Sequence, residues 1–298
     1  MTVRSAEALT PMTATPARKR ASLDEIRKFH ARLMAAQANS PDPRLERIFE
    51  LVPREAFLPP GPWQIKTNQQ YIETPSADPV YIHQNVLVAL DAAKGINNGE
   101  PYLHAAWIGA AAPKSGERVC HVGTGLGYYT AILSMLVLPG GRVQAFEIEE
   151  ALATQARRNL QPFEAVTVTH GDATRIALPA SDLIYVNAGV AAPPLGWLKA
   201  LRPGGRLIFP WRPSEEVGLS VLVTRTSGGL VVKPFMPAWF IPCIGASGTE
   251  DCTRVPSRRE ARSARSIWCV AERAPDETAV AIYKDVWFSS AAVDAWTA

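Results

Sequence analysis

Between residues 118 and 209 the chain alternates short apolar runs with longer segments whose apolar residues recur every three or four positions. Short runs bounded by turn residues are typical of buried strands, and the longer periodic segments are typical of amphipathic helices. The predicted strands are residues 118–122, 142–146, 165–169, 183–186 and 206–209, and the predicted helices are residues 128–136, 149–160 and 194–201. Strands and helices in this order form a parallel sheet covered by helices.

The pattern changes after Pro210. Residues 219–224 and 230–235 predict two strands, and the Ser227-Gly228-Gly229 sequence between them is typical of a hairpin turn. We therefore expect an α/β fold over residues 101–246, with a doubly wound, mostly parallel seven-stranded sheet. Residues 247–298 combine an arginine-rich stretch with apolar runs, which indicates an α+β extension.

The first hundred residues show a different organisation. Helical spacing behind Ser22 predicts a helix over residues 23–34, and a second helix is predicted over residues 43–52. Six prolines from residue 53 to residue 79 disfavour long regular structure, so we expect this stretch to wrap over a neighbouring domain. Residues 23–100 then form an N-terminal helical cap, and the polar residues 1–22 form a disordered tail.

Composition narrows the class of protein. The 298 residues are 47% hydrophobic and 20% charged, and a net charge of +3 is too small to indicate a nucleic-acid partner. No apolar run reaches the roughly 18 residues of a membrane span. The four cysteines form no Cys-x-x-Cys pair, so they predict neither a metal site nor a disulfide framework. We expect a cytoplasmic protein with reduced thiols; the sequence does not predict its oligomeric state.

A glycine-rich turn follows the first predicted strand of the sheet. In Gly123-Thr124-Gly125-Leu126-Gly127 the glycines allow a sharp bend and let a ligand approach the backbone closely. Dinucleotide-binding enzymes usually have the spacing G-x-G-x-x-G, and here the third glycine comes one residue early. Taken alone, such a turn is often only a tight turn.

Two acidic residues follow later strands of the same sheet. Glu147 and Ile148 end the second strand, where a carboxylate can accept hydrogen bonds from two ribose hydroxyls. Asp172 and Ala173 follow the next strand, where an adenine amino group requires an acceptor. Each acid alone is also compatible with a helix N-cap, but their order on successive strands favours S-adenosyl-L-methionine over a nicotinamide cofactor.

These features together resemble the protein-L-isoaspartate O-methyltransferases. The resemblance rests on VCHVGTGLGYYTAIL, the Glu147 and Asp172 pair, LRPGGRLIFP, the upstream RIFELVPREAFLPP and the downstream FIPCIG, and it spans residues 44–245. It implies a Rossmann-like methyltransferase fold with S-adenosyl-L-methionine as methyl donor, and a protein or peptide as substrate. It also implies that residues 23–100 include the loop that contacts the methyl acceptor.

The acceptor loop departs from the family pattern. The family usually reads Thr-Ile-Ser-x-Pro, and the aligned residues here are Asn97-Asn98-Gly99-Glu100-Pro101, so glycine replaces the serine. Asn187 likewise stands where the family has a threonine. Because this glycine removes a hydroxyl and frees the loop, we expect weak or absent methylation of a generic isoaspartyl peptide, and a gain on Gly99→Ser.

The candidate acceptor residues are Asn97, Asn98, Gly99, Glu100, His104 and Asn187. The three residues 97–99 are also compatible with a plain turn, and His104 with a helix residue beneath the loop. A carboxylate acceptor needs no general base, whereas a hydroxyl or amine would need one, for which His104, Glu100, His83 and Asp78 are nearby in sequence. Glu100 adds a negative charge that disfavours an anionic acceptor unless a nearby cation such as Lys94 offsets it.

The leading hypothesis is a methyltransferase that esterifies a carboxylate, with protein isoaspartyl residues as the implied acceptor. The alternatives are a methyltransferase of the same fold acting on an aspartate in a tailored peptide or on a small acid, a catalytically silent module that binds S-adenosyl-L-methionine, and a nicotinamide oxidoreductase. The early third glycine disfavours the last of these.

Overall fold

The computed structural model describes residues 20–68, 70–249 and 252–293. Most of the predicted tail therefore lies outside the described residues. Ser22 begins the first helix as its N-cap, with the Glu25 side chain closing a capping box.

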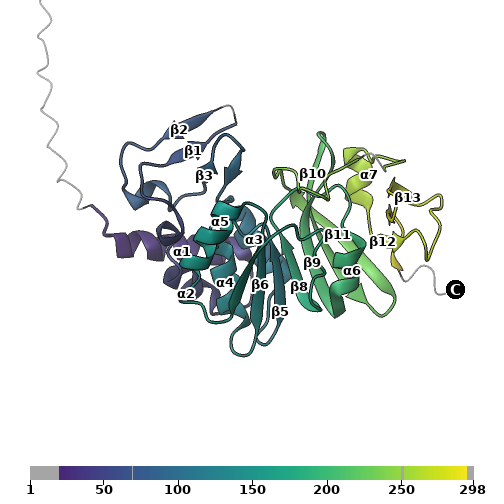
Figure 1. The fold of residues 1–298 in the computed structure, drawn as a ribbon, viewed down its shortest axis with the longest axis horizontal. Coiled ribbons are helices and arrows are strands. Elements are labelled where there is room, and N and C mark those ends of the chain that lie inside the picture. The colour runs from purple at the N-terminus through teal and green to yellow at the C-terminus, as the bar shows by residue number, and fades with distance from the viewer. Residues whose placement is uncertain (1–19, 69, 250–251, 294–298) are drawn as a thin grey trace, which may run out of the picture.

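The centre of the molecule is one ten-stranded sheet (Figure 1). Its order is β13-β14-β12-β11-β10-β9-β8-β5-β6-β7, with parallel pairing from β9 to β7 and antiparallel pairing elsewhere. The strands are β5 (Arg118–Val122), β6 (Arg142–Glu147), β7 (Val166–His170), β8 (Ser181–Val186), β9 (Leu201–Ser214), β10 (Val217–Thr226), β11 (Gly229–Pro237), β12 (Ser266–Cys269), β13 (Ala279–Ile282) and β14 (Val286–Ser289). The α/β fold class is confirmed.

The predicted seven strands are present as β5 to β11, but three more strands extend the sheet. They come from the C-terminal extension, whose β12 pairs with β11. An unpaired edge at β11 would offer free backbone groups to other chains, and β12 covers part of it. The predicted, mostly parallel arrangement holds for β5 to β11, with four parallel and two antiparallel pairings. The ten-stranded sheet as a whole is mixed, because every strand beyond β9 runs antiparallel to its neighbour.

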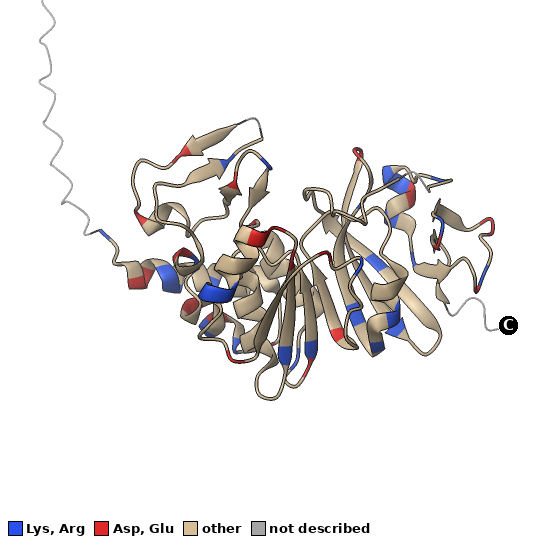
Figure 2. Cartoon of the chain, in the orientation of Figure 1, with Lys and Arg blue, Asp and Glu red and all other residues tan. Residues whose placement is uncertain are grey.

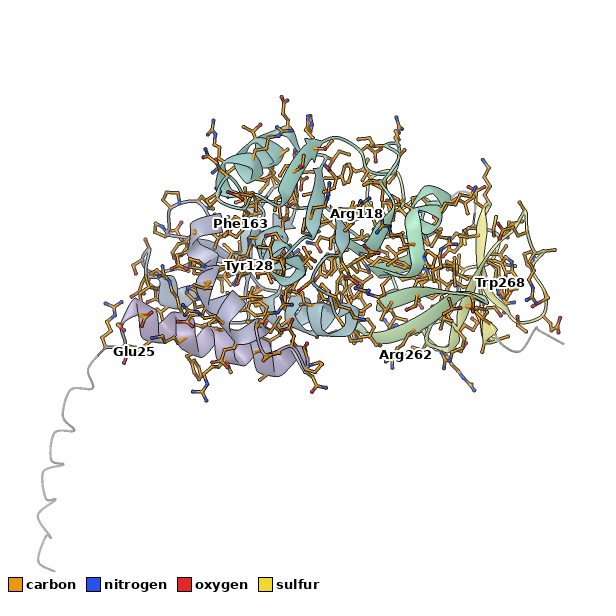
Figure 3. The ribbon with its side chains drawn as sticks, turned by 90° about the horizontal axis from the view of Figure 1, so that it is seen from below. Glu25, Arg118, Tyr128, Phe163, Arg262 and Trp268 are labelled. Atoms are coloured by element: carbon orange, nitrogen blue, oxygen red, sulfur yellow. The ribbon has the colours of Figure 1, made fainter. Side chains whose placement is uncertain are left out.

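Helices cover both faces of the sheet. Successive side chains along a strand point to opposite faces, so each strand contributes residues to the two hydrophobic cores between the sheet and its helices. Val119 of β5 packs with helices α1 (Leu23–Ala38), α2 (Leu45–Leu51), α3 (Pro101–Ala111) and α4 (Tyr128–Val137), beside which lies α5 (Glu150–Asn159). Cys120, the next residue, packs in the opposite core with α6 (Leu195–Ala200) and α7 (Arg258–Ser263). Figure 3 shows the first core filling the space around Tyr128 and Phe163.

The N-terminal cap is only partly helical, which corrects the prediction. Residues 64–97 form a second, four-stranded sheet in the order β2-β1-β3-β4, with β1 (Gln64–Lys66), β2 (Tyr71–Glu73), β3 (Leu87–Asp91) and β4 (Ile96–Asn97). Two 3₁₀ helices, η1 (Arg54–Phe57) and η2 (Pro79–Tyr81), complete it. The prolines do exclude long strands, but the three-residue strands β1 and β2 fit between Pro62 and Pro75, and β3 and β4 follow Pro79.

The chain reverses its winding direction between β5 and β8. From β5 it proceeds outward to β6 and β7, and then returns to place β8 on the other side of β5. Ligands of open α/β sheets bind at such a switch point, outside the carboxyl ends of the strands. Figure 2 shows acidic and basic residues interspersed over the molecule. None of the helices in the described residues is long and apolar enough to cross a membrane.

Candidate active site

The glycine turn lies at the carboxyl end of β5. Gly123, Gly125 and Gly127 have φ values of 76°, 57° and 97°, a left-handed region that side chains rarely adopt. The amides of Gly123 and Thr124 both donate to the carbonyl of Phe146, which holds the turn against the end of β6. Gly127 does not line the pocket, and a Cβ atom there would lie 2.8 Å from Leu160 Cδ1. The packing of α4 therefore requires this glycine, rather than the predicted close approach of a cofactor.

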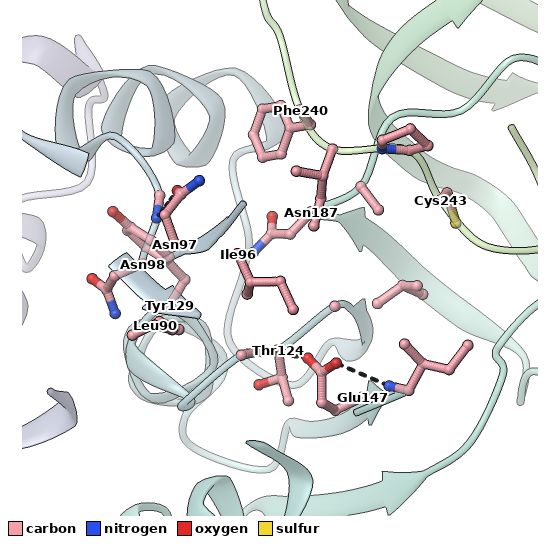
Figure 4. A pocket seen from close by; sticks show the side chains of 18 of the residues that line it. Leu90, Ile96, Asn97, Asn98, Thr124, Tyr129, Glu147, Asn187, Phe240 and Cys243 are labelled. Carbon is pink, nitrogen blue, oxygen red and sulfur yellow. Dashed lines mark hydrogen bonds between the residues drawn. The ribbon is translucent and has the colours of Figure 1, made fainter. Parts of the chain in front are cut away.

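Glu147 faces the same turn from the end of β6. Its Oε2 accepts the Gly125 amide at 2.7 Å, and its Oε1 accepts the amides of Ile148 and Glu149 at 3.0 and 3.1 Å (Figure 4). The side chain is 6% exposed, and this burial raises the pKa of the carboxyl against the opposing effect of the three amides. Glu147 thus sets the shape of the turn as well as presenting a carboxylate to the pocket.

Asp172 follows β7 and is oriented by its own loop. Its Oδ1 accepts both the amide and the hydroxyl of Thr174, at 2.8 and 2.7 Å. A Cβ atom on Gly245 would lie 3.2 Å from Oδ2 of Asp172, so the segment after β11 passes closely beside it. Burial and the nearby charge of Asp172 raise the pKa of Cys243 to about 12, so this thiol stays protonated.

A pocket of about 770 Å³ joins these elements to the N-terminal cap. It is lined by seven of the eight predicted cofactor residues, by all six predicted acceptor residues and by the segment 237–244. In Figure 4 Asn187 lies between Phe240 and Ile96, with Glu147 and Thr124 on the opposite side from Asn97 and Asn98. The volume falls in the range of small-molecule sites, and it spans both sets of predicted residues.

Arg54, from the VPREAF signature, organises the acceptor loop. Its guanidinium is fully buried, and it donates to Asn98 Oδ1 at 3.0 Å and to the Gly99 carbonyl at 3.0 Å. Further bonds reach the carbonyls of Ile82 and Val86, both at 2.8 Å. The Gly99 amide donates to Asn97 Oδ1 at 2.9 Å. The glycine is therefore held on both sides, and the loop lacks the freedom that the sequence led us to expect. A free loop consequently gives no reason to expect weak methylation of an isoaspartyl peptide.

His104 lies directly beneath Gly99 in α3. Its ring stacks on Tyr129 with the centroids 3.7 Å apart, and its Nδ1 is 2.9 Å from the Tyr185 hydroxyl. A Cβ atom on Gly99 would lie 2.8 Å from His104 Cδ2, closer still to Nε2, and 3.0 Å from Tyr129. Gly99 also has a φ of 78°. We therefore expect Gly99→Ser to reduce methyl transfer rather than raise it, because the imidazole already fills that space.

A buried polar network links the glycine turn to Asn187. His121 of β5 contacts Thr130 Oγ1 through Nδ1 at 2.7 Å and the Asn187 amide nitrogen through Nε2 at 2.8 Å. Thr130 in turn contacts the hydroxyl of Thr124. Burial lowers the pKa of His121 to about 3, so the ring is neutral at pH 7. The network fixes the rotamer of Asn187 beside the cofactor turn.

Three other sequence candidates lie elsewhere. His83 is buried against Glu55, with Nε2 2.7 Å from Oε2, and Asp78 caps η2 through the Val80 amide; neither lines the pocket. Lys94 pairs with Glu149 at 2.5 Å, so it does not offset Glu100, which accepts a bond from Asn85. The described residues contain no cluster of three or more His, Cys, Asp or Glu side chains suited to a metal.

Several residues in or beside the pocket were missed by sequence reasoning: Arg54, His121, Tyr128, Tyr129, Arg212 and the rim residue Trp239. The sequence could have indicated His121, because an ionisable residue is unusual inside an apolar strand, and Arg54, because it is an ionisable residue within the VPREAF signature. No comparable signal marks the others.

Known proteins are similar to this chain over most of its length. Residues 35–248 match the family model described as protein-L-isoaspartate(D-aspartate) O-methyltransferase. The chain belongs to this family. The protein-L-isoaspartate O-methyltransferase of Ignicoccus hospitalis is 33% identical over 65% of this chain and 85% of its own length. Protein-L-isoaspartate O-methyltransferase 2 of Marinobacter nauticus is 32% identical over 76% of this chain and 96% of its own length.

Solved structures agree on the fold. A protein-L-isoaspartate O-methyltransferase superposes with a TM-score of 0.63 at 20% identity, covering 88% of this chain and 86% of its own. A Plasmodium falciparum beta-aspartate methyltransferase in complex with S-adenosyl-L-homocysteine gives 0.58 at 16% identity, covering 73% and 97%. As a member of this family the chain is an O-methyltransferase that uses S-adenosyl-L-methionine.

Proposed function

We propose that the enzyme methylates the free carboxylate of isoaspartyl or D-aspartyl residues in proteins and peptides. The observation that carries this proposal is one pocket in which the glycine turn, Glu147 and Asp172 face the acceptor loop and Asn187. The family match over residues 35–248 supports the choice of acceptor.

The pocket residues fit S-adenosyl-L-methionine. Glu147 is the candidate acceptor for the ribose hydroxyls, and Asp172 is the candidate acceptor for the adenine amino group. Ala173 and the exposed side chain of Ile148 also line the pocket next to these two acids in the sequence. The turn residues Gly123, Thr124 and Gly125 leave room for close backbone approach. Bound there, the cofactor supplies a methyl group activated by its positively charged sulfur.

The acceptor end requires positioning more than acid–base chemistry. A carboxylate oxygen forms a bond to the methyl carbon while the carbon–sulfur bond breaks and its electron pair stays on sulfur. No proton moves, so neither His104 nor Glu100 has to act as a base. Arg54 holds the loop at Asn98 and Gly99, and the His121 network holds Asn187, so the protein supplies a fixed geometry for the in-line approach.

The compartment and partners form part of the same proposal. All four cysteines are free thiols in the structure, which supports a reducing, cytoplasmic location. The mixed distribution of charges and the net charge of +3 favour peptide chains over nucleic acid as the partner.

The product identifies the reaction. An isoaspartyl peptide is incubated with methyl-labelled cofactor, and the labelled peptide is isolated and treated with mild base. A methyl ester releases labelled methanol, whereas an N-methyl or ether product retains the label. Glu147→Ala should weaken cofactor binding by about 1–3 kcal/mol through loss of charge-assisted hydrogen bonds. Label that resists base, or no label with cofactor binding intact, would contradict the proposed acceptor.

A further inference from the structure

Lys66 and Arg212 are basic residues that line the pocket and have no part in the proposed function so far. Lys66 comes from the cap, and Arg212 comes from β9 of the ten-stranded sheet. Arg212 lies near the end of β9, where its backbone amide donates to the Val190 carbonyl in the segment after β8. Its Nη1 donates to the Phe240 carbonyl at 2.6 Å, which fixes the guanidinium against the rim segment. The side chain is only 15% exposed.

Gly189 provides the space for this arginine. A Cβ atom at Gly189 would lie 2.9 Å from Arg212 Cδ and 3.2 Å from the Phe240 carbonyl oxygen. The backbone of Gly189 is not in the left-handed region, so conformation does not demand glycine here. The lack of space for a side chain demands it, because the arginine side chain passes over Gly189, in the segment after β8, and lines the pocket.

The ion pair of Arg212 is incomplete. Its Nη2 contacts Glu215 Oε2 at 3.0 Å, while Nε is buried and has no hydrogen-bond partner. Nε and Nη2 lie on one edge of the guanidinium, and that edge matches both oxygens of a carboxylate. Glu215 is 95% exposed, so its pairing is weakened by water and salt. A carboxylate that reached both nitrogens would displace it.

We propose that Arg212 is the residue that binds the carboxylate of the methyl acceptor, and that Glu215 occupies this position until the acceptor arrives. The inference rests on the proposed function, and it adds a specificity determinant to it: the acceptor must carry a negative charge at this end of the pocket. Methylation removes that charge. The neutral ester then loses its hold on Arg212, and Glu215 returns, which favours product release.

Binding measurements separate this role from turnover. The enzyme is saturated with S-adenosyl-L-homocysteine, and calorimetry measures the affinity of an isoaspartyl peptide and of the same peptide with the free carboxylate replaced by a carboxamide. The wild type should prefer the carboxylate roughly tenfold or more, because hydrogen bonds to charged groups are the strong ones. Arg212→Gln should abolish this preference and leave carboxamide affinity within about twofold.

Glu215→Gln is the matched variant with the opposite sign. It removes the internal competitor from an exposed site, so carboxylate affinity should rise up to about fivefold. Melting temperature and affinity for S-adenosyl-L-homocysteine serve as folding controls, and Glu215→Gln still tests the proposal if Arg212→Gln fails to fold. Full carboxylate preference in Arg212→Gln, or no gain in Glu215→Gln, would overturn the role of Arg212.

The proposed function can fail independently. A peptide that binds with an Arg212-dependent preference but is never methylated supports the role of Arg212 and removes isoaspartyl methylation as the activity. A peptide that is methylated by Arg212→Gln with unchanged KM and carboxylate preference keeps the activity and overturns the inference. Absence of binding by either peptide to the wild type would overturn both.

Discussion

Replacing Gly99 with serine should destabilise the protein because two independent costs meet at this position. The φ of 78° lies in the left-handed region, which costs an L-residue roughly 1–2 kcal/mol. The new Cβ atom would also lie 2.8 Å from His104 Cδ2 and 3.0 Å from Tyr129 Cε2, and overpacking of this kind typically costs about 1–3 kcal/mol. We therefore expect a total loss of about 2–5 kcal/mol in the free energy of unfolding.

Gly116→Ser is the matched control for the conformational cost. Gly116 has a φ of 85°, and a Cβ atom added there would meet no atom within 4 Å beyond its chain neighbours. This variant should therefore lose only the roughly 1–2 kcal/mol of the left-handed conformation. Urea unfolding of both variants gives the steric cost at Gly99 as the difference between them.

A double-mutant cycle assigns that steric cost to the imidazole. In the His104→Ala background the ring is gone and only the 3.0 Å approach to Tyr129 Cε2 remains. Gly99→Ser should therefore cost less than in the wild-type background, and the coupling energy should approach the larger part of the steric cost of about 1–3 kcal/mol. Equal losses for the two serine variants in the wild-type background, or a cycle without coupling, would refute the reasoning. Methyl transfer by Gly99→Ser should fall rather than rise.

Three further predictions follow from the packing. Burial lowers the pKa of His30 to about 3 in the folded protein, from 6.5 in the unfolded chain. Its contribution to stability is therefore complete above pH 6.5 and is lost as the pH falls toward 3. His30→Leu should narrow the difference in unfolding free energy between pH 7 and pH 5 by about 2 kcal/mol, as measured by urea unfolding. Arg54→Met should lower the free energy of unfolding by about 3 kcal/mol or more, because it leaves buried acceptors without their donor. The side chain of Arg47 is 63% exposed, so Arg47→Met should lower it by less than about 1 kcal/mol. Chemical denaturation compares the two variants. Removing residues 248–298 should cause aggregation seen by light scattering, because it exposes Trp211, which stacks on Phe288 with the ring centroids 4.1 Å apart. Removal of residues 1–19, which lie outside the described residues, is the control and should leave the melting temperature unchanged.

The sequence predicted the part of the fold that depends on local pattern. The strands and helices from β5 to β11 follow from apolar periodicity, and their boundaries differ from the prediction mainly at β9, β10 and β11, which are longer. The four short strands of the cap were not predictable in this way, because two to five residues carry too little pattern and their pairing depends on distant segments. The same holds for β12 to β14.

The site divides along the same line. The glycine turn, Glu147 and Asp172 were predictable because each follows a strand, and strand order places strand ends together. The steric exclusion of a side chain at Gly99 was not predictable from the sequence. It depends on His104, five residues later, lying on a helix that turns back under the loop. The roles of His83 and Lys94 were misjudged for a similar reason, since nearness in sequence did not place them in the pocket.

The most direct test of the proposed activity is the ratio of kcat/KM for two peptides of identical sequence, one with an isoaspartyl linkage and the other with a normal aspartyl linkage. Labelled S-adenosyl-L-methionine is the donor, and Glu147→Ala is the control with an impaired cofactor site. We predict transfer by the wild type that favours the isoaspartyl peptide by about tenfold or more, since one misplaced reacting atom costs at least that much in a fixed geometry. Equal transfer to both peptides, or transfer to neither while the cofactor binds, would contradict this activity.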